Sequence, residues 1–197
     1  MTLLLAMEAV EQGRASLDDM VMASDLARRQ SGTRIFLETG EEQTLEVMLK
    51  GIAIESANDA SVAVAEFLAG SVEAFAEMMN KRAKELGMND SFFVNPSGLP
   101  ETSGQGNVMS AYDIAIVSRE LIKYPKVMEW LGTWMEPIRV GQKNEFMMVN
   151  KNKLLKGDFY YSGADGIKTG FTNEAGWCLS ATAKKGNLRC TPTDHVP

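Results

Sequence analysis

Two short stretches of this sequence combine residue types that can do chemistry. The first is "IESANDAS", in which Ser56 and Asn58 stand at the break between two predicted helices. Backbone groups at helix ends lack intrahelical partners, so a hydroxyl and an amide placed there can face a cleft. The alternative is structural, because Ser and Asn are also good residues for capping helices. By itself this stretch leaves the choice between a polar site and a cap open.

The second stretch is "GADGIKTGFT", which carries Lys168, Thr169 and Gly170 on a predicted strand. A glycine weakens a strand unless another backbone has to come close to it. A cation, a hydroxyl and an unobstructed edge suit an extended peptide that ends in a carboxylate and binds by strand addition. The structural alternative is an edge strand that its lysine protects against aggregation.

The composition limits which groups can act as nucleophile and base. The single histidine, His195, lies in the tail "TPTDHVP", which has no periodicity and contains two prolines. A Ser-His-Asp or Cys-His device needs a positioned imidazole, and such a tail is a poor place for one. Lysine is then the expected base. Two cysteines and one histidine are also too few for a structural zinc site. We expect neither a metal nor a cofactor.

The charge and hydropathy of the chain bear on its partners. The net charge is −6, so little basic surface is available to neutralise a run of phosphates, and we expect no nucleic-acid partner. No stretch approaches the roughly 18 apolar residues that a membrane-spanning helix needs. Residues 1–7 are apolar but lack the basic leader and cleavage site of a signal peptide.

The spacing of apolar residues and the positions of capping and turn residues predict the elements that hold the two stretches. Helical stripes predict helices over residues 1–12, 45–54, 60–69, 72–86, 111–124 and 127–132. Thr44, Ser71 and Ser110 stand at helix starts as predicted N-caps. Short extended runs follow over residues 133–140, 145–150, 166–172 and 176–187. Helices followed by strands indicate an α+β fold with an antiparallel sheet.

The two chemical stretches occur in the order that one enzyme class requires. Penicillin-binding proteins and class A β-lactamases carry the motifs S-x-x-K, S-D-N and K-T-G, and this sequence has "SAN" and "KTG". It resembles the serine D-alanyl-D-alanine carboxypeptidases, low-molecular-mass penicillin-binding proteins that trim peptidoglycan stem peptides, and most of all their sporulation-type members. The stretches that carry this resemblance are "LLKGIAIESANDA", "NKRAKELGM", "FVNPSGL", "SAYDIA" and "GADGIKTGFTNEAG". It covers about residues 1–189 and implies a β-lactamase/transpeptidase-like (DD-peptidase) fold.

The resemblance implies a mechanism for the motif residues. In the family a serine attacks the terminal D-Ala–D-Ala bond, water releases the acyl-enzyme, and penicillins are mistaken for the substrate. By position, Ser56 would help to relay the proton to the leaving amine. Asn58 would bind the substrate backbone and hold the catalytic lysine, and Lys168 would supply positive potential for the substrate's terminal carboxylate.

Three further residues receive substrate-binding roles from the same resemblance. Thr169 would donate a hydrogen bond to the terminal carboxylate, and Gly170 would let the peptide lie against the strand. The backbone N–H of Phe171 would be one of two oxyanion donors, the other belonging to the nucleophilic serine.

The sequence departs from the family pattern at both ends. It contains no S-x-x-K, and the resemblance places that motif just before Met1. Past Arg189 the family continues into a closing strand and a membrane-binding C-terminal helix, whereas residues 190–197 form a tail outside the resemblance. We therefore expect a partial domain over 1–189, no carboxypeptidase activity in this chain alone, and unpaired strand edges that favour aggregation.

The resemblance also implies a location. It implies an extracytoplasmic, membrane-associated protein whose membrane contact comes only through the C-terminal region.

Two other functions are alternatives to the carboxypeptidase. One alternative is a non-catalytic fragment that binds muropeptides without cleaving them. The other is a class A β-lactamase, which needs a deacylating glutamate, and no segment before Lys168 supplies one convincingly.

Overall fold

The computed structural model describes residues 1–101, 104–190 and 193–196. Its helices are α1 (Thr2–Glu11), α2 (Asp25–Arg28), α3 (Leu45–Lys50), the π-helix η1 (Gly51–Glu55), α4 (Asn58–Ala69), α5 (Val72–Leu86), α6 (Ala111–Leu121) and α7 (Pro125–Gly132). Its strands are β1 (Met20–Met22), β2 (Glu42–Thr44), β3 (Met135–Ile138), β4 (Phe146–Val149), β5 (Ala164–Thr172), β6 (Gly176–Lys185), β7 (Leu188–Cys190) and β8 (Thr193–Val196). The predicted α+β class is confirmed.

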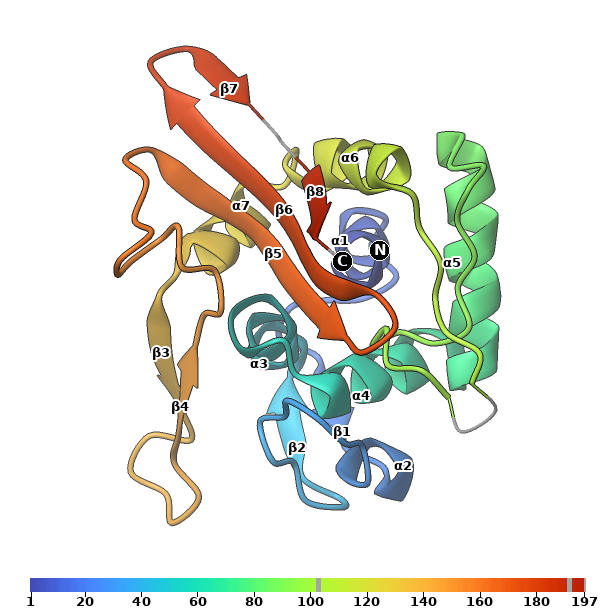
Figure 1. The fold of residues 1–197 in the computed structure, drawn as a ribbon. Helices are drawn as coiled ribbons and strands as arrows, with labels where there is room; N and C mark the ends of the chain where they lie inside the picture. Colours follow the sequence, from blue (N-terminus) through green and yellow to red (C-terminus); the bar gives the residue numbers. More distant parts are fainter. Residues whose placement is uncertain (102–103, 191–192, 197) are drawn as a thin grey trace.

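The helical part is built around α1 and α4. Figure 1 shows α1 near the middle, with α5 and α6 beside it and the long β5–β6 pair crossing in front. The residues of α1 from Thr2 to Met7 are all buried, and so are those of α4 from Asn58 to Ala65. A helix that is buried all round belongs in the interior of a domain. These two helices therefore carry the core on which the site rests.

The predicted caps begin their helices as expected. The side chains of Thr44, Ser71 and Ser110 accept hydrogen bonds from the backbone N–H groups three residues on, at Val47, Ala74 and Asp113. Such a cap pairs one of the orphan N–H groups of the first turn. The sequence-predicted starts of α3, α5 and α6 are confirmed.

One local feature was not expected from the sequence. The helix predicted over residues 45–54 changes at Gly51 into the π-helix η1, which ends at Ser56 in the left-handed conformation, with φ +70° and ψ +41°. A residue other than glycine seldom adopts this conformation. Single π-turns within α-helices are frequent at functional sites. The helix–helix break at Ser56 is therefore a sharp turn rather than a simple gap.

The main sheet has β6 at its centre. β5 pairs with β6 antiparallel, so that Lys168 lies opposite Ser180 and Gly170 opposite Cys178. β7 and the backbone of β8 pair with two different parts of β6. Within the described ranges β5 pairs with β6 alone, so its other edge carries no strand. Two separate antiparallel pairs, β1–β2 and β3–β4, flank the helical part.

The tail after Arg189 differs from the sequence-based expectation, which placed no strand there. The backbone of Thr193–Val196 pairs with Trp177–Ser180 of β6. Proline excludes a central strand but tolerates an edge, and in this sequence Pro192 and Pro197 flank the paired segment instead of interrupting it. Part of the β6 edge that was expected to be unpaired therefore has a strand partner.

Three further observations concern the described residues. No helix among residues 1–101, 104–190 and 193–196 has the length and apolar character needed to cross a membrane. Cys178 and Cys190 are both free thiols. The same ranges contain no group of three or more His, Cys, Asp or Glu side chains arranged to hold a metal ion.

Candidate active site

Ser56 and Lys168 meet although 112 residues separate them in the sequence. The Lys168 Nζ donates to the Ser56 Oγ at 2.8 Å and also to the carbonyl of Thr169 at 3.2 Å. The first residue ends η1 and the second lies in β5, so this contact joins the helical part to the sheet. The structure thus brings together one residue from each of the two stretches that the sequence singled out.

The environment of Lys168 weakens its hold on a proton. Burial and, to a smaller extent, the nearby charge of Lys151 lower the pKa of its ammonium from 10.5 to about 8, although the charge of Glu55 acts in the opposite direction. A lysine with such a pKa is still mostly charged at neutral pH but releases a proton readily. It can therefore attract an anion and take part in proton transfer.

Glu55, which the sequence reasoning did not single out, fixes the turn that presents Ser56. This buried carboxylate accepts a hydrogen bond from the Val149 backbone N–H at 2.7 Å and from Lys151 Nζ at 2.9 Å. Both donors belong to β4 or to the segment just after it. Because a buried carboxylate without partners is costly, these contacts hold the end of η1 against β4.

Asn58 points toward the segment before β2. Its side-chain Nδ2 donates to the carbonyl of Ser31 at 2.9 Å, and its backbone N–H donates to the carbonyl of Thr33 at 2.8 Å. A Cβ on Gly32, whose φ is +70°, would lie 2.9 Å from that Nδ2, so only glycine fits between them. The predicted contact of Asn58 with a substrate and a catalytic lysine stays a prediction.

Asp59, the next residue, is a second anchor that the sequence reasoning missed. Its carboxylate is completely buried and accepts hydrogen bonds from the backbone N–H groups of Ile35 and Leu37, both at 3.1 Å. The start of α4 therefore binds residues 31–37 through the side-chain amide of Asn58 and the carboxylate of Asp59. An acidic residue in the first turn of a buried helix was the available signal, but it did not reveal the partners.

The remaining predicted residues lie along β5 beside its unpaired edge. Thr169 is half-buried and Gly170 is exposed. Phe171 is 52% exposed, and its ring lies 4.7 Å from the ring of Trp177, centroid to centroid, at the neighbouring position of β6. Residues 168–171 thus offer a cation, a hydroxyl and backbone groups at one accessible edge.

The start of β5 is tied to α7 through two buried asparagines. Asn152 Nδ2 donates to the carbonyl of Gly166 at 3.2 Å. Asn150 Nδ2 donates to the carbonyls of Leu131 and Thr133, both at 3.0 Å, and its Oδ1 accepts from the Asn152 backbone. A satisfied buried polar network of this kind favours a single geometry. It holds the strand that carries Lys168.

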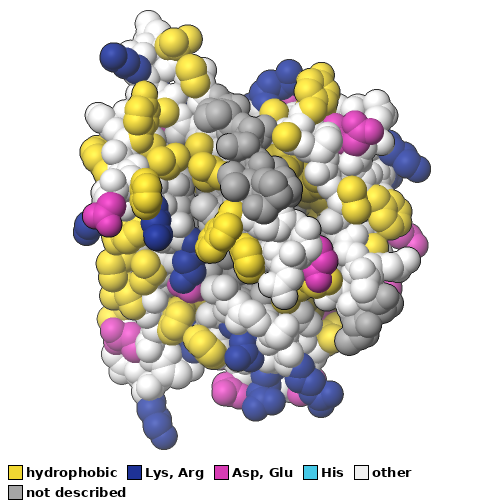
Figure 2. All heavy atoms as spheres, viewed as in Figure 1, with side chains coloured by type: hydrophobic (Ala, Val, Ile, Leu, Met, Phe, Trp, Pro, Cys, Tyr) yellow, Lys and Arg dark blue, Asp and Glu magenta, His cyan; other side chains and the backbone are white. Residues whose placement is uncertain are grey.

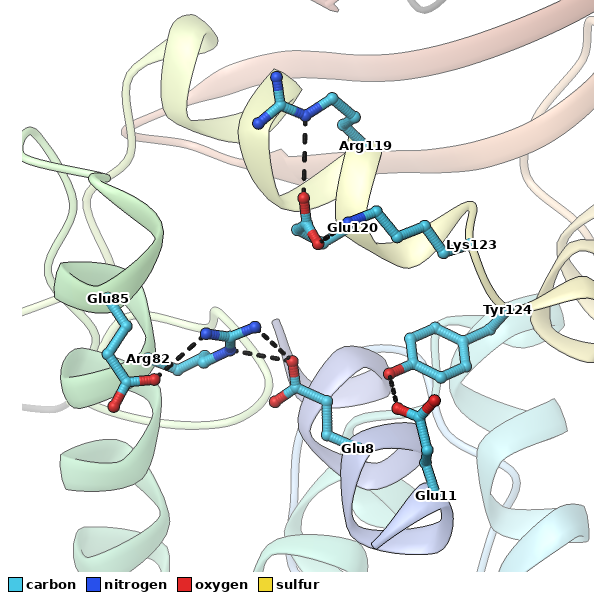
Figure 3. Close-up of polar contacts among 8 residues, drawn as sticks. All are labelled: Glu8, Glu11, Arg82, Glu85, Arg119, Glu120, Lys123 and Tyr124. Atoms are coloured by element: carbon cyan, nitrogen blue, oxygen red, sulfur yellow. Dashed lines mark hydrogen bonds and ion pairs between the residues drawn. The ribbon is translucent and has the colours of Figure 1, made fainter.

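A second polar region lies among α1, α5, α6 and the turn into α7, and Figure 3 shows its side chains. We call it the helical ion cluster; its members are Glu8, Glu11, Arg82, Glu85, Arg119, Glu120, Lys123 and Tyr124. Most of these residues line a hollow of about 620 Å³, which none of the predicted site residues lines. Arg82 pairs with Glu8 at 2.8 Å and with Glu85 at 3.2 Å, and Tyr124 donates to Glu11 at 2.9 Å. Its charges satisfy one another, so we do not assign the active site there.

The arrangement of helices beneath an antiparallel sheet is shared with solved penicillin-binding proteins of the DD-peptidase class. The fold matches PBP3 of Streptococcus pneumoniae, a peptidoglycan synthesis regulatory factor, with a TM-score of 0.90 and 31% identity over 98% of this chain and 57% of that chain. It matches ampicillin-bound penicillin-binding protein D2 of Listeria monocytogenes with a TM-score of 0.81 and 30% identity over 98% and 76% of the two chains.

The chain belongs to the D-alanyl-D-alanine carboxypeptidase family, whose model matches residues 1–192. It is 50% identical to the D-alanyl-D-alanine carboxypeptidase DacF of Bacillus subtilis over 189 residues, which are 96% of this chain and 47% of DacF. It is 32% identical to DacD of Escherichia coli over 92% of this chain and 46% of DacD. The chain thus spans about half the length of the curated relatives that it matches.

Proposed function

We propose that these residues form the main part of the active site of a serine D-alanyl-D-alanine carboxypeptidase, which removes the terminal D-Ala from peptidoglycan stem peptides through an acyl-enzyme. The observation that carries the proposal is the 2.8 Å contact between Lys168 and Ser56 at the open edge of β5. The family match and the names of the relatives favour this activity over the class A β-lactamase and the non-catalytic binding fragment.

The substrate peptide would add as a further strand to the open edge of β5. Strand addition gives affinity through main-chain hydrogen bonds, and a terminal carboxylate adds charge-assisted ones. Lys168 would attract that carboxylate and Thr169 would donate to it. Gly170 would let the peptide backbone come close.

Bond breaking would use the groups nearest the Ser–Lys contact. As the nucleophilic serine of the family attacks the D-Ala–D-Ala carbonyl, the Phe171 backbone N–H would stabilise the developing oxyanion. Ser56 would pass a proton to the leaving amine, and the low pKa of Lys168 supports such a transfer along the Lys168–Ser56 hydrogen bond. Asn58 would bind the substrate backbone.

Inhibitors and location follow the same proposal. Penicillin-binding protein D2 of Listeria monocytogenes has been solved with ampicillin and with cefotaxime. We infer that β-lactams occupy the corresponding edge here, and that the protein acts on the cell wall outside the cytoplasmic membrane. Membrane contact through a C-terminal region stays a prediction of the family resemblance.

Peptide binding by the 197-residue chain tests the site directly. Calorimetry with a peptide ending in D-Ala-D-Ala and its L-Ala-L-Ala isomer should show binding of the first and much weaker binding of the second. Lys168→Met should remove that preference, and Lys81→Met, which changes an exposed lysine of α5, should keep it. Equal binding of the two isomers would overturn the proposal.

Covalent chemistry needs a separate test because the sequence contains no S-x-x-K. We expect no fluorescent penicillin to stay attached to the purified chain after denaturation, and a labelled band on a denaturing gel would contradict this. An in-frame Ser-x-x-Lys codon set directly upstream of Met1 would supply the nucleophile. Its absence from the gene would count against the acyl-enzyme route.

A further inference from the structure

Arg34 is a cation without a carboxylate partner among the described residues. Its Nε–H is buried and donates no hydrogen bond to those residues, and its guanidinium carbon lies 5.1 Å above the centre of the Phe36 ring. The neighbouring arginines differ, since Arg28 pairs with Glu38 at 3.0 Å and Arg29 pairs with Asp25. An arginine held over an aromatic ring keeps its N–H edge free to bind a planar anion.

The surroundings of Arg34 favour an anion. A hollow of about 250 Å³ is lined by Arg28, Arg29, Arg34, Phe36, Leu37 and Glu38. Three guanidinium groups face one carboxylate in this lining, and that carboxylate is engaged by Arg28. Figure 2 shows several Lys and Arg side chains close together on the lower part of the face that carries β5 and β6 in Figure 1.

The segment that carries Arg34 is attached to the active site. Asn58, two residues after Ser56, binds the carbonyls of Ser31 and Thr33. Asp59 binds the N–H groups on either side of Phe36, at Ile35 and Leu37. The segment that lines the anion hollow and the Ser56 turn are therefore joined by hydrogen bonds at the start of α4.

The same contacts decide which way the segment faces. Ile35 and Leu37 are buried, whereas Arg34 is half-buried and Phe36 is 53% exposed. Phe36 has a φ of +58°, so this segment is not a regular strand; the burial of Ile35 and Leu37 is what leaves Arg34 and Phe36 on the outer side. Arg34 directly follows Thr33, whose carbonyl contacts Asn58. Arg34 is thus one residue away from a direct contact of Asn58, the residue that the family resemblance places beside the substrate backbone.

We propose that Arg34 is a specificity residue that binds a side-chain carboxylate of the substrate peptide upstream of its D-Ala-D-Ala end, with Phe36 below its guanidinium. This deepens the proposed carboxypeptidase function and rests on it. A carboxylate fits because the planar guanidinium fork offers it two parallel N–H donors. The site would favour stem peptides with a free acid over those in which that acid is amidated.

The test uses matched peptides and the whole 197-residue chain. Two peptides share the D-Ala-D-Ala end and differ only in carrying a carboxylate or a carboxamide on the upstream side chain. Calorimetry should show about tenfold tighter binding of the acid, as expected for a charge-assisted pair at a partly exposed site. Arg34→Gln should abolish this difference, Arg34→Lys should keep part of it, and Arg14→Gln, on an exposed arginine after α1, should leave it intact.

The outcomes separate this inference from the proposed function. If neither peptide binds better than its L-Ala-L-Ala isomer, the carboxypeptidase site fails, and titration with glutarate, followed by the Arg34 Nε–H signal in NMR, tests the anion hollow alone. A shift of that signal with glutarate supports the hollow, and no shift overturns it. If D-Ala-D-Ala peptides bind but acid and amide bind equally, only the role of Arg34 fails. Tighter binding of inorganic phosphate than of glutarate would overturn the assignment to a carboxylate.

Discussion

The Ser56–Lys168 site and the helical ion cluster are both polar regions built from several elements, but they differ in whether their cations have carboxylate partners. In the cluster, Arg82 has two carboxylate partners and Tyr124 donates to a third. At the site, a hydroxyl and a carbonyl are the only hydrogen-bond acceptors that Lys168 has within residues 1–101, 104–190 and 193–196. A half-buried cation such as Lys168, without a paired anion, costs stability, and proteins keep such groups where they serve function. The comparison indicates that incomplete pairing marks the site.

The carboxylates of the two regions differ as well. In the cluster, Glu8 and Glu85 bind a side chain, whereas Asp59 at the site binds backbone N–H groups in another segment. The site is therefore held by contacts to the backbone, which leave its side-chain cations available. Five predictions test this difference.

The largest effect is expected from Asp59→Ala. The change leaves the N–H groups of Ile35 and Leu37 buried without an acceptor, and each orphaned group costs about 1–3 kcal/mol. We expect the free energy of unfolding, measured by urea denaturation, to fall by about 3 kcal/mol. Asp18→Ala, on an exposed turn, should change it by less than about 0.5 kcal/mol. Equal effects of the two changes would refute the anchoring role of Asp59.

Lys168→Met should separate binding from stability. Loss of the charged donor should weaken binding of a D-Ala-D-Ala peptide by about 10- to 100-fold, as for a hydrogen bond to a charged group. Burial opposes the charge of Lys168, so the free energy of unfolding at pH 7 should not fall. Isothermal titration and urea denaturation of the same samples measure both quantities. A large loss of stability with unchanged binding would reverse the assignment.

The pH dependence should move binding and stability in opposite directions. Above its pKa of about 8 the folded-state Lys168 loses its charge, so peptide affinity should fall by about tenfold between pH 7 and pH 9. Between pH 8 and pH 10.5, Lys168 is still protonated in the unfolded chain but has lost its proton in the folded chain. The contribution of Lys168 to the free energy of unfolding therefore rises with pH across this interval.

The helical ion cluster should behave differently over the same range. Burial, followed by the hydrogen bond to Glu11, raises the pKa of Tyr124 from 10.0 to about 12. The stability that this neutral phenol contributes is complete below pH 10 and is lost as the pH rises through about 12. Fluorescence-detected urea titrations of Tyr124→Phe and the unchanged chain at pH 8 and pH 11 should show their difference shrinking. A difference that grows with pH would contradict the assignment.

The smallest effect is expected from Arg82→Met in the cluster. The change leaves Glu8 and Glu85 without their shared partner, and partly exposed pairs of this kind contribute about 1 kcal/mol. The free energy of unfolding should fall by that amount while the affinity for a D-Ala-D-Ala peptide stays constant. Thermal denaturation and calorimetry check the two halves of this prediction. Weaker peptide binding would show that the cluster is coupled to the site.

Local patterns in the sequence were sufficient for most elements of the fold. Side-chain caps such as Ser71 and Ser110 act within a few residues, and the period of apolar residues reports which face of a helix is buried. The motifs also placed Ser56 and Lys168 in one site, and the structure joins them through a hydrogen bond. These features depend on short-range chemistry or on motifs that recur in a family.

Tertiary structure decided how the site is held and what surrounds it. Glu55 finds its partner in β4, 94 residues along the chain, and Asp59 finds its partners 22 and 24 residues before it. No local pattern specifies such contacts, because they depend on which elements pack together. The same holds for Arg34, which has no carboxylate partner in the part of the chain that the structure describes, since such a cation can be recognised only once the positions of nearby carboxylates are known. The sequence by itself determined the class of protein and its motif residues; packing decided which charges are paired and which stay free to bind.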